Sequence, residues 1–157
     1  MTSNNLELFF SPSAPSTVID SLLATGGTTL YETLNGNLYS DSGLTILAGR
    51  IAISQTIFDI LDLNMNGKFE TTGQAVLVLP NGTIQYIFAG QTIKTPSGKY
   101  VFPSTVYTFN ITSCTGIYMP MYGQITITSQ DSPNGLVLLR KFDVALKWRN
   151  SNNYLYT

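Results

Sequence analysis

Two charged residues stand alone among apolar neighbours near opposite ends of the chain. Glu7 lies in the short apolar run Leu6–Phe10, and Arg140 lies on the even-numbered, otherwise apolar side of Leu136–Arg149. If these segments are neighbouring strands, Glu7 and Arg140 come close together. A carboxylate and a guanidinium shielded from water form either a salt bridge that closes the fold or a catalytic pair. We therefore take Glu7 and Arg140 as candidate catalytic residues.

The turn that follows the first run supplies further candidates. Ser11 and Pro12 end the run, and we expect Glu7 to lie beside them at one mouth of the fold. Arg50 is the second arginine that could reach this mouth. Arg140 itself has two interpretations: a charge that lines a cavity, or a residue at the end of a barrel whose guanidinium extends to water.

The composition excludes several kinds of chemistry. The chain has no histidine and one cysteine, Cys114, which excludes histidine-based zinc sites and Ser-His or Cys-His nucleophile pairs. No metal and no cofactor are expected. The net charge of −1, with 11% charged residues, gives no reason to expect a nucleic acid partner.

The N-terminus, MTSNNLELFF, lacks a basic segment followed by a long apolar run, so we expect no signal peptide. No stretch of apolar residues is long enough to predict a membrane span. These patterns predict synthesis without secretion and leave the compartment open, a virion included.

The segment from Thr105 to Thr128 predicts the architecture. Apolar and polar residues alternate in Thr105–Thr112 and in Tyr122–Thr128, which is typical of half-buried strands. Ser113–Met121, with a glycine and a proline, joins them as a long, shaped loop. The sequence therefore predicts a β-hairpin here.

The rest of the chain continues this pattern, with turn residues between short segments. Ser16–Ala24 has apolar residues at helical spacing and predicts a short helix, and Asn35-Gly36 predicts a tight hairpin turn. About eight antiparallel strands follow, so residues 1–157 are expected to form one all-β domain, an eight-stranded antiparallel barrel, with a two-sheet sandwich as the alternative. The residues expected to be buried are Phe109, Ile125, Ile127, Phe142, Val144 and Leu146.

The predicted hairpin also carries a family resemblance. Cys114-Thr-Gly-Ile-Tyr118 followed by Met121-Tyr-Gly-Gln-Ile125 resembles the conserved hairpin of the allene oxide cyclase and dirigent superfamily. Asn37-Leu-Tyr-Ser40, followed by Ala48-Gly49, is similar to a Leu-Tyr-Ser and Ala-Gly segment of the cyclases. The resemblance implies a lipocalin-like, commonly trimeric barrel with an apolar cavity.

The resemblance also implies site residues. The cyclases hold a water with a Ser-Pro pair and asparagines, helped by a glutamate, and the matching candidates here are Ser11, Pro12, Asn37 and Glu7. Tyr118, in the hairpin motif, is a further candidate for ligand binding. The spacing of the N-terminal residues is compressed relative to the cyclases, and their cysteine after Ala-Gly is replaced near Arg50.

Two classes of function follow from these observations. In the first, the barrel binds a small apolar ligand in its lumen and steers a cyclisation or isomerisation, which needs little more than a shaped cavity and one polar group. In the second, it is a non-catalytic structural protein, such as a virion protein, that associates with itself. Sparse charge and apolar strand surface predict a homo-oligomer, trimer or dimer, in either class. An open lumen favours the first class and a filled lumen the second.

Overall fold

The computed structural model describes residues 3–24, 26–61, 67–96, 98–102, 106–131 and 138–148. All of the described strands belong to one antiparallel sheet, and the described connection between β8 and β9 contains the 3-10 turn η2. In chain order the elements are β1 (Ser3–Phe10), β2 (Val18–Leu23), β3 (Leu30–Tyr39), β4 (Leu47–Ile57), β5 (Lys68–Leu79), β6 (Gly82–Lys94), β7 (Tyr100–Val101), β8 (Val106–Cys114), η2 (Gly116–Tyr118), β9 (Met121–Asp131) and β10 (Leu138–Trp148).

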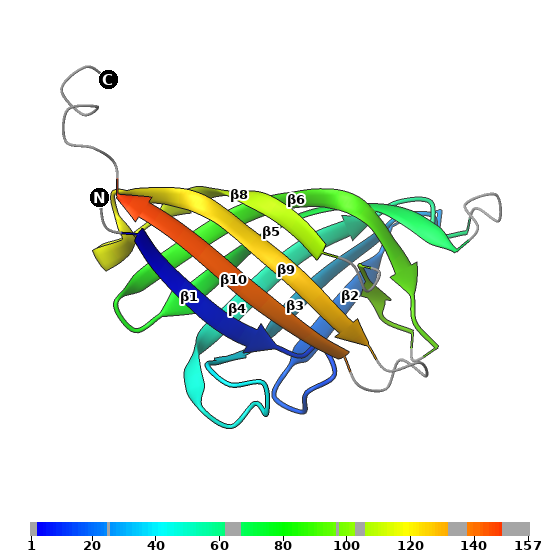
Figure 1. Cartoon of the computed structure of the whole chain (residues 1–157). Coiled ribbons are helices and arrows are strands. Elements are labelled where there is room, and N and C mark those ends of the chain that lie inside the picture. The colour runs from blue at the N-terminus through cyan, green and yellow to red at the C-terminus, as the bar shows by residue number, and fades with distance from the viewer. Residues whose placement is uncertain are drawn as a thin grey trace, which may run out of the picture.

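The sheet closes into the expected eight-stranded antiparallel barrel. Its strands follow the order β1, β10, β9, β8, β6, β5, β4 and β3, and the pair Phe9–Tyr39 joins β3 back to β1. β2 continues along β3 beyond the closure, and β7 adds to the end of β6. Figure 1 shows the strands tilted across the barrel, with β1 and β10 side by side.

Alternation along the strands separates the inside of the barrel from the outside. On β10 the even residues Phe142, Val144 and Leu146 are at most 2% exposed, and on β9 Ile125 is fully buried, as predicted. Phe109 and Ile127 face the same interior but are only half-buried. Arg140 lies on this inner face of β10, in line with Phe142.

The predicted helix over Ser16–Ala24 is wrong, because Val18–Leu23 forms strand β2. β3 offers a full edge to pair with, from Asn35 to Leu30, and the two β-branched residues at the start of the segment favour an extended chain. A segment of this length also gains little from helix formation, since the first turn of a helix is costly.

The predicted hairpin turn at Asn35-Gly36 is also wrong, since both residues lie inside β3. Gly36 is needed for packing and not for a turn. A Cβ at this position would lie 2.7 Å from Cε1 of Phe10 and 2.8 Å from Oγ1 of Thr17. The chain turns after β3 instead, where the carboxylate of Asp41 accepts hydrogen bonds from the backbone N–H groups of Thr45 and Ile46.

The hairpin between Val106–Cys114 and Met121–Asp131 forms as predicted, and η2 shapes its loop. Three ends of predicted strands, Thr105, Leu136 and Arg149, lie outside the described residues. Within the described part of the chain, no helix has the length and apolar character needed to cross a membrane.

Candidate ligand site in the barrel lumen

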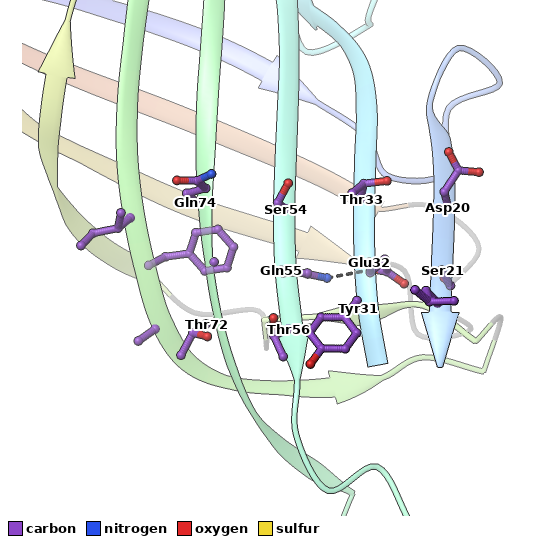
Figure 2. Close-up of a pocket in the computed structure, with 15 residues that line it drawn as sticks. Asp20, Ser21, Tyr31, Glu32, Thr33, Ser54, Gln55, Thr56, Thr72 and Gln74 are labelled. Atoms are coloured by element: carbon purple, nitrogen blue, oxygen red, sulfur yellow. Dashed lines mark hydrogen bonds between the residues drawn. The ribbon is translucent and has the colours of Figure 1, made fainter. Parts of the chain in front are cut away.

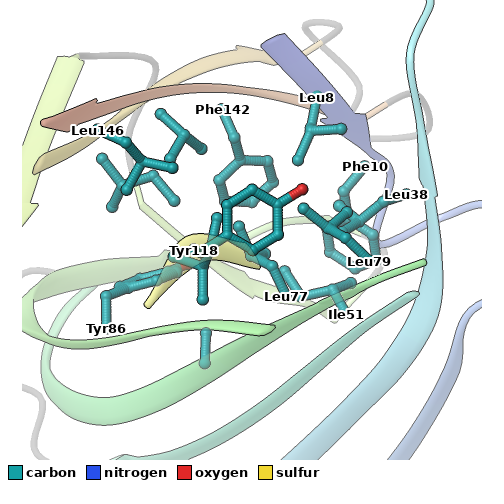
Figure 3. Close-up of a cluster of buried hydrophobic side chains, with 14 of the residues drawn as sticks. Leu8, Phe10, Leu38, Ile51, Leu77, Leu79, Tyr86, Tyr118, Phe142 and Leu146 are labelled. Atoms are coloured by element: carbon teal, nitrogen blue, oxygen red, sulfur yellow. The ribbon is translucent and has the colours of Figure 1, made fainter. Parts of the chain in front are cut away.

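One half of the lumen is filled by closely packed apolar side chains (Figure 3). Tyr118, carried inward by η2, lies among them and is 9% exposed. Burial raises the pKa of its hydroxyl above the ordinary value. Other members of this packed half include Leu38, Ile51, Leu77, Leu79, Ile84, Ile125, Val144 and Leu146.

The other half of the lumen contains a cavity of about 70 Å³. Its wall is mostly aromatic and aliphatic, with polar groups from four strands. The apolar wall includes Phe10, Pro12, Leu34, Ile53, Phe88, Phe102, Phe109 and Ile127. Besides Tyr100 of β7, the lining residues with polar side chains are Gln55, Tyr86, Ser129 and Arg140, and we call these four residues with their apolar wall the lumen site.

The cavity exists because two neighbouring strands diverge. β6 and β8 pair only at the end near η2, from Ile84–Cys114 to Tyr86–Ile111. Beyond that point β6 turns away from β8 and pairs with β7. The side chain of Phe102 fills the space between β6 and β8. Its ring centroid lies 5.8 Å from that of Phe88 and 4.8 Å from that of Tyr107. Phe102 therefore forms one wall of the lumen site without belonging to the barrel strands.

Arg140 and Ser129 are register partners on β10 and β9, and both are buried, at 7% and 4% exposure. Nη1 of Arg140 donates a hydrogen bond to the backbone oxygen of Leu139 at 3.2 Å. The hydroxyl of Ser129 is buried and makes no hydrogen bond with the described part of the chain. An unsatisfied buried hydroxyl is costly, so a hydrogen-bonding ligand at this position would stabilise the site.

Gln55 enters the lumen site from β4, held by Glu32 of β3. Nε2 of Gln55 donates to Oε1 of Glu32 at 2.7 Å, and the two residues are 8% and 7% exposed. Burial raises the pKa of Glu32, while hydrogen bonds from Gln55 and Ser21 act in the opposite direction. This contact fixes the orientation of the Gln55 amide, whose carbonyl oxygen stays available to a ligand.

Tyr86 of β6 supplies the fourth polar group. It is 2% exposed, and its ring stacks on that of Phe109 with centroids 6.0 Å apart. Burial raises the pKa of its hydroxyl far above the ordinary value, so the group stays protonated and acts as a hydrogen-bond donor. Among the described residues it has no hydrogen-bond partner.

The expected pairing of Glu7 with Arg140 is wrong. Glu7 points out of the barrel, and its Oε2 lies 3.4 Å from Nζ of Lys141, with 56% of the side chain exposed. The reason is the alternation of β1, in which Leu6, Leu8 and Phe10 face the lumen. Glu7 has the opposite parity and cannot reach the inner face where Arg140 lies.

The other candidates are spread over several places. Pro12 lines the lumen site, and Ser11 is buried next to it, with its Oγ accepting from the backbone N–H of Ser13 at 3.2 Å. Asn37 and Arg50 lie together on the outside of β3 and β4, where Nη1 of Arg50 donates a hydrogen bond to Oδ1 of Asn37 at 3.5 Å. Only Arg140 and Pro12 of the predicted site residues therefore line the lumen site.

The predicted site residues do not include Gln55, Ser129 or Tyr86, although the sequence carries a signal for two of them. Gln55 interrupts the inward series Ile51, Ile53 and Ile57 on β4. Ser129 follows Ile125 and Ile127 in the same way on β9. A polar residue on the apolar side of an alternating strand marks a position that faces the lumen.

No protein-family model and no curated protein matches the chain significantly. Among solved structures, it is similar to the pterocarpan synthase dirigent protein GePTS1, with a TM-score of 0.64, 11% identity, and coverage of 94% of this chain and 89% of that chain. It is also similar to a pyocyanin demethylase, with a TM-score of 0.58, 13% identity, and coverage of 92% of this chain and 100% of that chain. A third similar structure is the Diels–Alderase AbmU from Streptomyces koyangensis, with a TM-score of 0.58, 14% identity, and coverage of 97% of this chain and 70% of that chain.

These likenesses concern the fold, because so few residues are identical. They confirm the resemblance that the hairpin motif predicted, at the level of architecture. The chain has the eight-stranded barrel fold of the dirigent proteins and of cyclase barrels such as the Diels–Alderase.

Proposed function

We propose that the barrel binds a small, mostly apolar ring compound in the lumen site and steers its cyclisation or isomerisation. The observation that carries this proposal is the cavity of about 70 Å³, lined by aromatic and aliphatic side chains and by the four polar groups of the lumen site. Apolar cavities with a few well-placed polar groups are the usual form of small-molecule sites. A lumen filled along its whole length would have favoured the structural role instead.

The size of the cavity limits the ligand. An engineered cavity of about 150 Å³ holds benzene, so the lumen site of about 70 Å³ takes only part of a ring in its present shape. Ligand entry therefore requires a wall residue to shift, and Phe102, which lies outside the barrel strands, is our candidate. The aromatic walls favour a flat molecule that stacks on Phe109 or Phe88.

The polar groups give the ligand an orientation. Arg140 and Ser129 lie together on one wall, where they would bind an oxygen that carries negative charge or develops it during the reaction. Tyr86 donates a further hydrogen bond, and Gln55 offers its carbonyl oxygen. A flexible substrate held between these groups is restricted to conformers in which the reacting atoms are close, and this restriction is the catalytic contribution.

The comparisons support this direction. Two of the similar structures are described as a pterocarpan synthase dirigent protein and as a Diels–Alderase. The lumen site offers arginine, tyrosine, serine and glutamine side chains for such a reaction.

Calorimetric titration with benzoate, phenol and toluene tests the proposal. We expect benzoate to bind the wild-type protein, and the Arg140→Met variant to lose about tenfold or more in affinity, since a hydrogen bond to a charged group contributes about 1.5–3 kcal/mol. Toluene binding should change little. Arg50→Met, which removes an arginine from the outer surface, is the matched control.

Tyr86→Phe keeps the ring and removes only the hydroxyl, so this variant tests the lumen site even if Arg140→Met impairs folding. We expect it to weaken phenol binding and leave toluene binding unchanged. The proposal fails if none of the three compounds binds, or if Arg140→Met and Tyr86→Phe bind all three as the wild type does.

A further inference from the structure

A second hollow lies on the outside of the barrel, across strands β2 to β6 (Figure 2). Its volume is about 810 Å³, and its floor is one row of register partners whose side chains point toward the lumen: Ser21, Glu32, Gln55, Gly73 and Phe88. Residues of the neighbouring inward rows, such as Ile53 and Ala75, do not line it. Gln55 and Phe88 also line the lumen site, so the two hollows, this outer groove and the lumen site, lie on opposite faces of the same stretch of sheet.

Two rows of outward-pointing side chains form the walls of the outer groove. The first row consists of the register partners Asp20, Thr33, Ser54, Gln74 and Ile87, and the second of Leu22, Tyr31, Thr56, Thr72 and Ala89. Four steps between neighbouring strands, each about 4.8 Å, give the groove a length of roughly 19 Å. The groove is therefore long enough for a short chain molecule laid across the strands.

The walls carry hydrogen-bonding groups with almost no charge. Five hydroxyl or amide side chains, Thr33, Ser54, Thr56, Thr72 and Gln74, lie between the ends of the groove, and Asp20 supplies the one carboxylate on the walls. The wall residues include no lysine or arginine. A nucleic acid or another polyanion would therefore find no positive partner here.

Tyr31 gives the groove an aromatic surface. Its side chain is 47% exposed, and its cross-strand neighbours are Leu22 and Thr56. The remaining large apolar side chain, Ile87, stands on the last strand of the groove, with the hydroxyl residues in between. The buried core of a protein interface is apolar, and these walls are apolar only at their two ends.

The wall side chains are also unpaired, unlike those on the opposite outer face of the barrel. On β8 and β9, the hydroxyls of Thr108 and Thr126 are 3.2 Å apart, and Nε2 of Gln124 lies 3.3 Å from Oδ1 of Asn110. In the outer groove, none of the five hydroxyl and amide side chains makes a hydrogen bond to another described residue. Their donors and acceptors are therefore open to a ligand.

We propose that the outer groove binds a neutral, polyhydroxylated chain, that is, an oligosaccharide or a segment of a neutral polysaccharide. Sugar hydroxyls both donate and accept hydrogen bonds, which matches the Thr, Ser and Gln side chains along the walls. The apolar C–H face of a sugar ring packs on an exposed aromatic ring, which Tyr31 offers. Asp20 can accept two hydrogen bonds from neighbouring hydroxyls.

Titration calorimetry with cellohexaose, xylohexaose and mannohexaose, and with hexagalacturonate as an anionic comparison, tests the proposal. We expect at least one neutral hexasaccharide to bind and hexagalacturonate to bind more weakly. Tyr31→Ala should weaken binding about tenfold or more, and Thr56→Val, which keeps the shape of the side chain, roughly threefold. Thr108→Val on the opposite outer face is the matched control and should bind as the wild type does.

Several results would overturn the proposal. One is the absence of binding by any neutral hexasaccharide at millimolar concentration. Another is binding that Tyr31→Ala and Thr56→Val leave unchanged, or that Tyr86→Phe in the lumen site reduces. The remaining alternative is that the groove is an interface between copies of the chain, and light scattering tests it. The groove would be such an interface if the wild type is an oligomer and Tyr31→Ala is a monomer of 17.2 kDa. Circular dichroism confirms that each variant is folded.

Discussion

The two halves of the lumen are lined by the same strands, yet one is filled and the other is hollow. Near η2, β6 and β8 are hydrogen-bonded, and side chains such as Leu77, Ile125 and Leu146 are completely buried. At the other end, β6 and β8 separate, and Phe102 enters from outside the barrel to close the wall. The packed half thus lies where β6 and β8 are paired, and the hollow half lies where they have separated.

The largest expected effect compares two isoleucines on the inner face of β9. Ile125 is fully buried in the packed half, and Ile127, two residues further, borders the cavity and is half-buried. We expect Ile125→Ala to lower the free energy of unfolding by about 2–5 kcal/mol, since a new void forms in a packed region. Ile127→Ala should cost at least about 1 kcal/mol less, because less apolar area is lost from burial.

Urea denaturation of both variants measures this difference. Equal losses would mean that the hollow half is packed as tightly as the filled half in solution, and the comparison would then fail.

The next effect compares two glycines that face the lumen. A Cβ on Gly73 would lie 2.4 Å from the backbone oxygen of Ser54 and also 2.4 Å from Cζ of Phe88. A Cβ on Gly90, in contrast, meets the ring of Phe102 first, at 2.9 Å. Backbone cannot move aside as a single ring can, so Gly73→Ala should cost about 1–3 kcal/mol. Gly90→Ala should cost less and should instead alter ligand binding, because Phe102 must shift.

Thermal unfolding and benzoate titration of the two variants separate these outcomes. A larger loss of stability for Gly90→Ala than for Gly73→Ala would show that Phe102 is held rigidly, contrary to its proposed movement.

A smaller effect concerns the pH dependence of stability. Burial raises the pKa of Glu32 above its ordinary 4.5, so the folded protein binds this proton more tightly than the unfolded chain does. The resulting stabilisation is fully present below 4.5 and is lost as the pH rises through the raised pKa. Glu32→Gln cannot titrate, so its urea midpoint should fall less than that of the wild type between acidic and neutral pH. Parallel pH profiles would contradict the assignment.

The sequence was sufficient to predict the barrel because alternation depends on the period of a strand, which each segment shows by itself. β10 illustrates this, since its even residues from Leu138 to Leu146 are buried as expected. The errors arose where a residue type has two uses. Gly36 packs under Phe10 and does not turn the chain, and β2 has helical spacing but finds an open strand edge.

The lumen site was harder to predict than the fold, because it depends on where strand pairing stops. Alternation puts Arg140 on the apolar side of β10 but leaves open whether it lines a cavity or reaches water at the end of the barrel, and its expected partner Glu7 lies on the outer face. Gln55 and Ser129 carry a recognisable pattern on their own strands. That they meet at one cavity depends on the divergence of β6 and β8, which no local pattern in the sequence indicates.

The smallest expected effect returns to Glu7, which tests whether the outer wall and the lumen site are independent. Glu7 lies 3.4 Å from Lys141 on the outer surface, and Arg140 lies on the inner surface of the adjacent strand. An exposed ion pair contributes about 1 kcal/mol or less, so Glu7→Ala should change the urea midpoint only slightly. Arg140→Met should have the larger effect, because it alters a buried position. Since the two side chains lie on opposite faces of the sheet and share no contact, their effects should add in the double variant within about 0.5 kcal/mol. A larger coupling energy would mean that Glu7 and Arg140 do interact in solution, and the separation of the outer surface from the hollow half of the lumen would have to be abandoned.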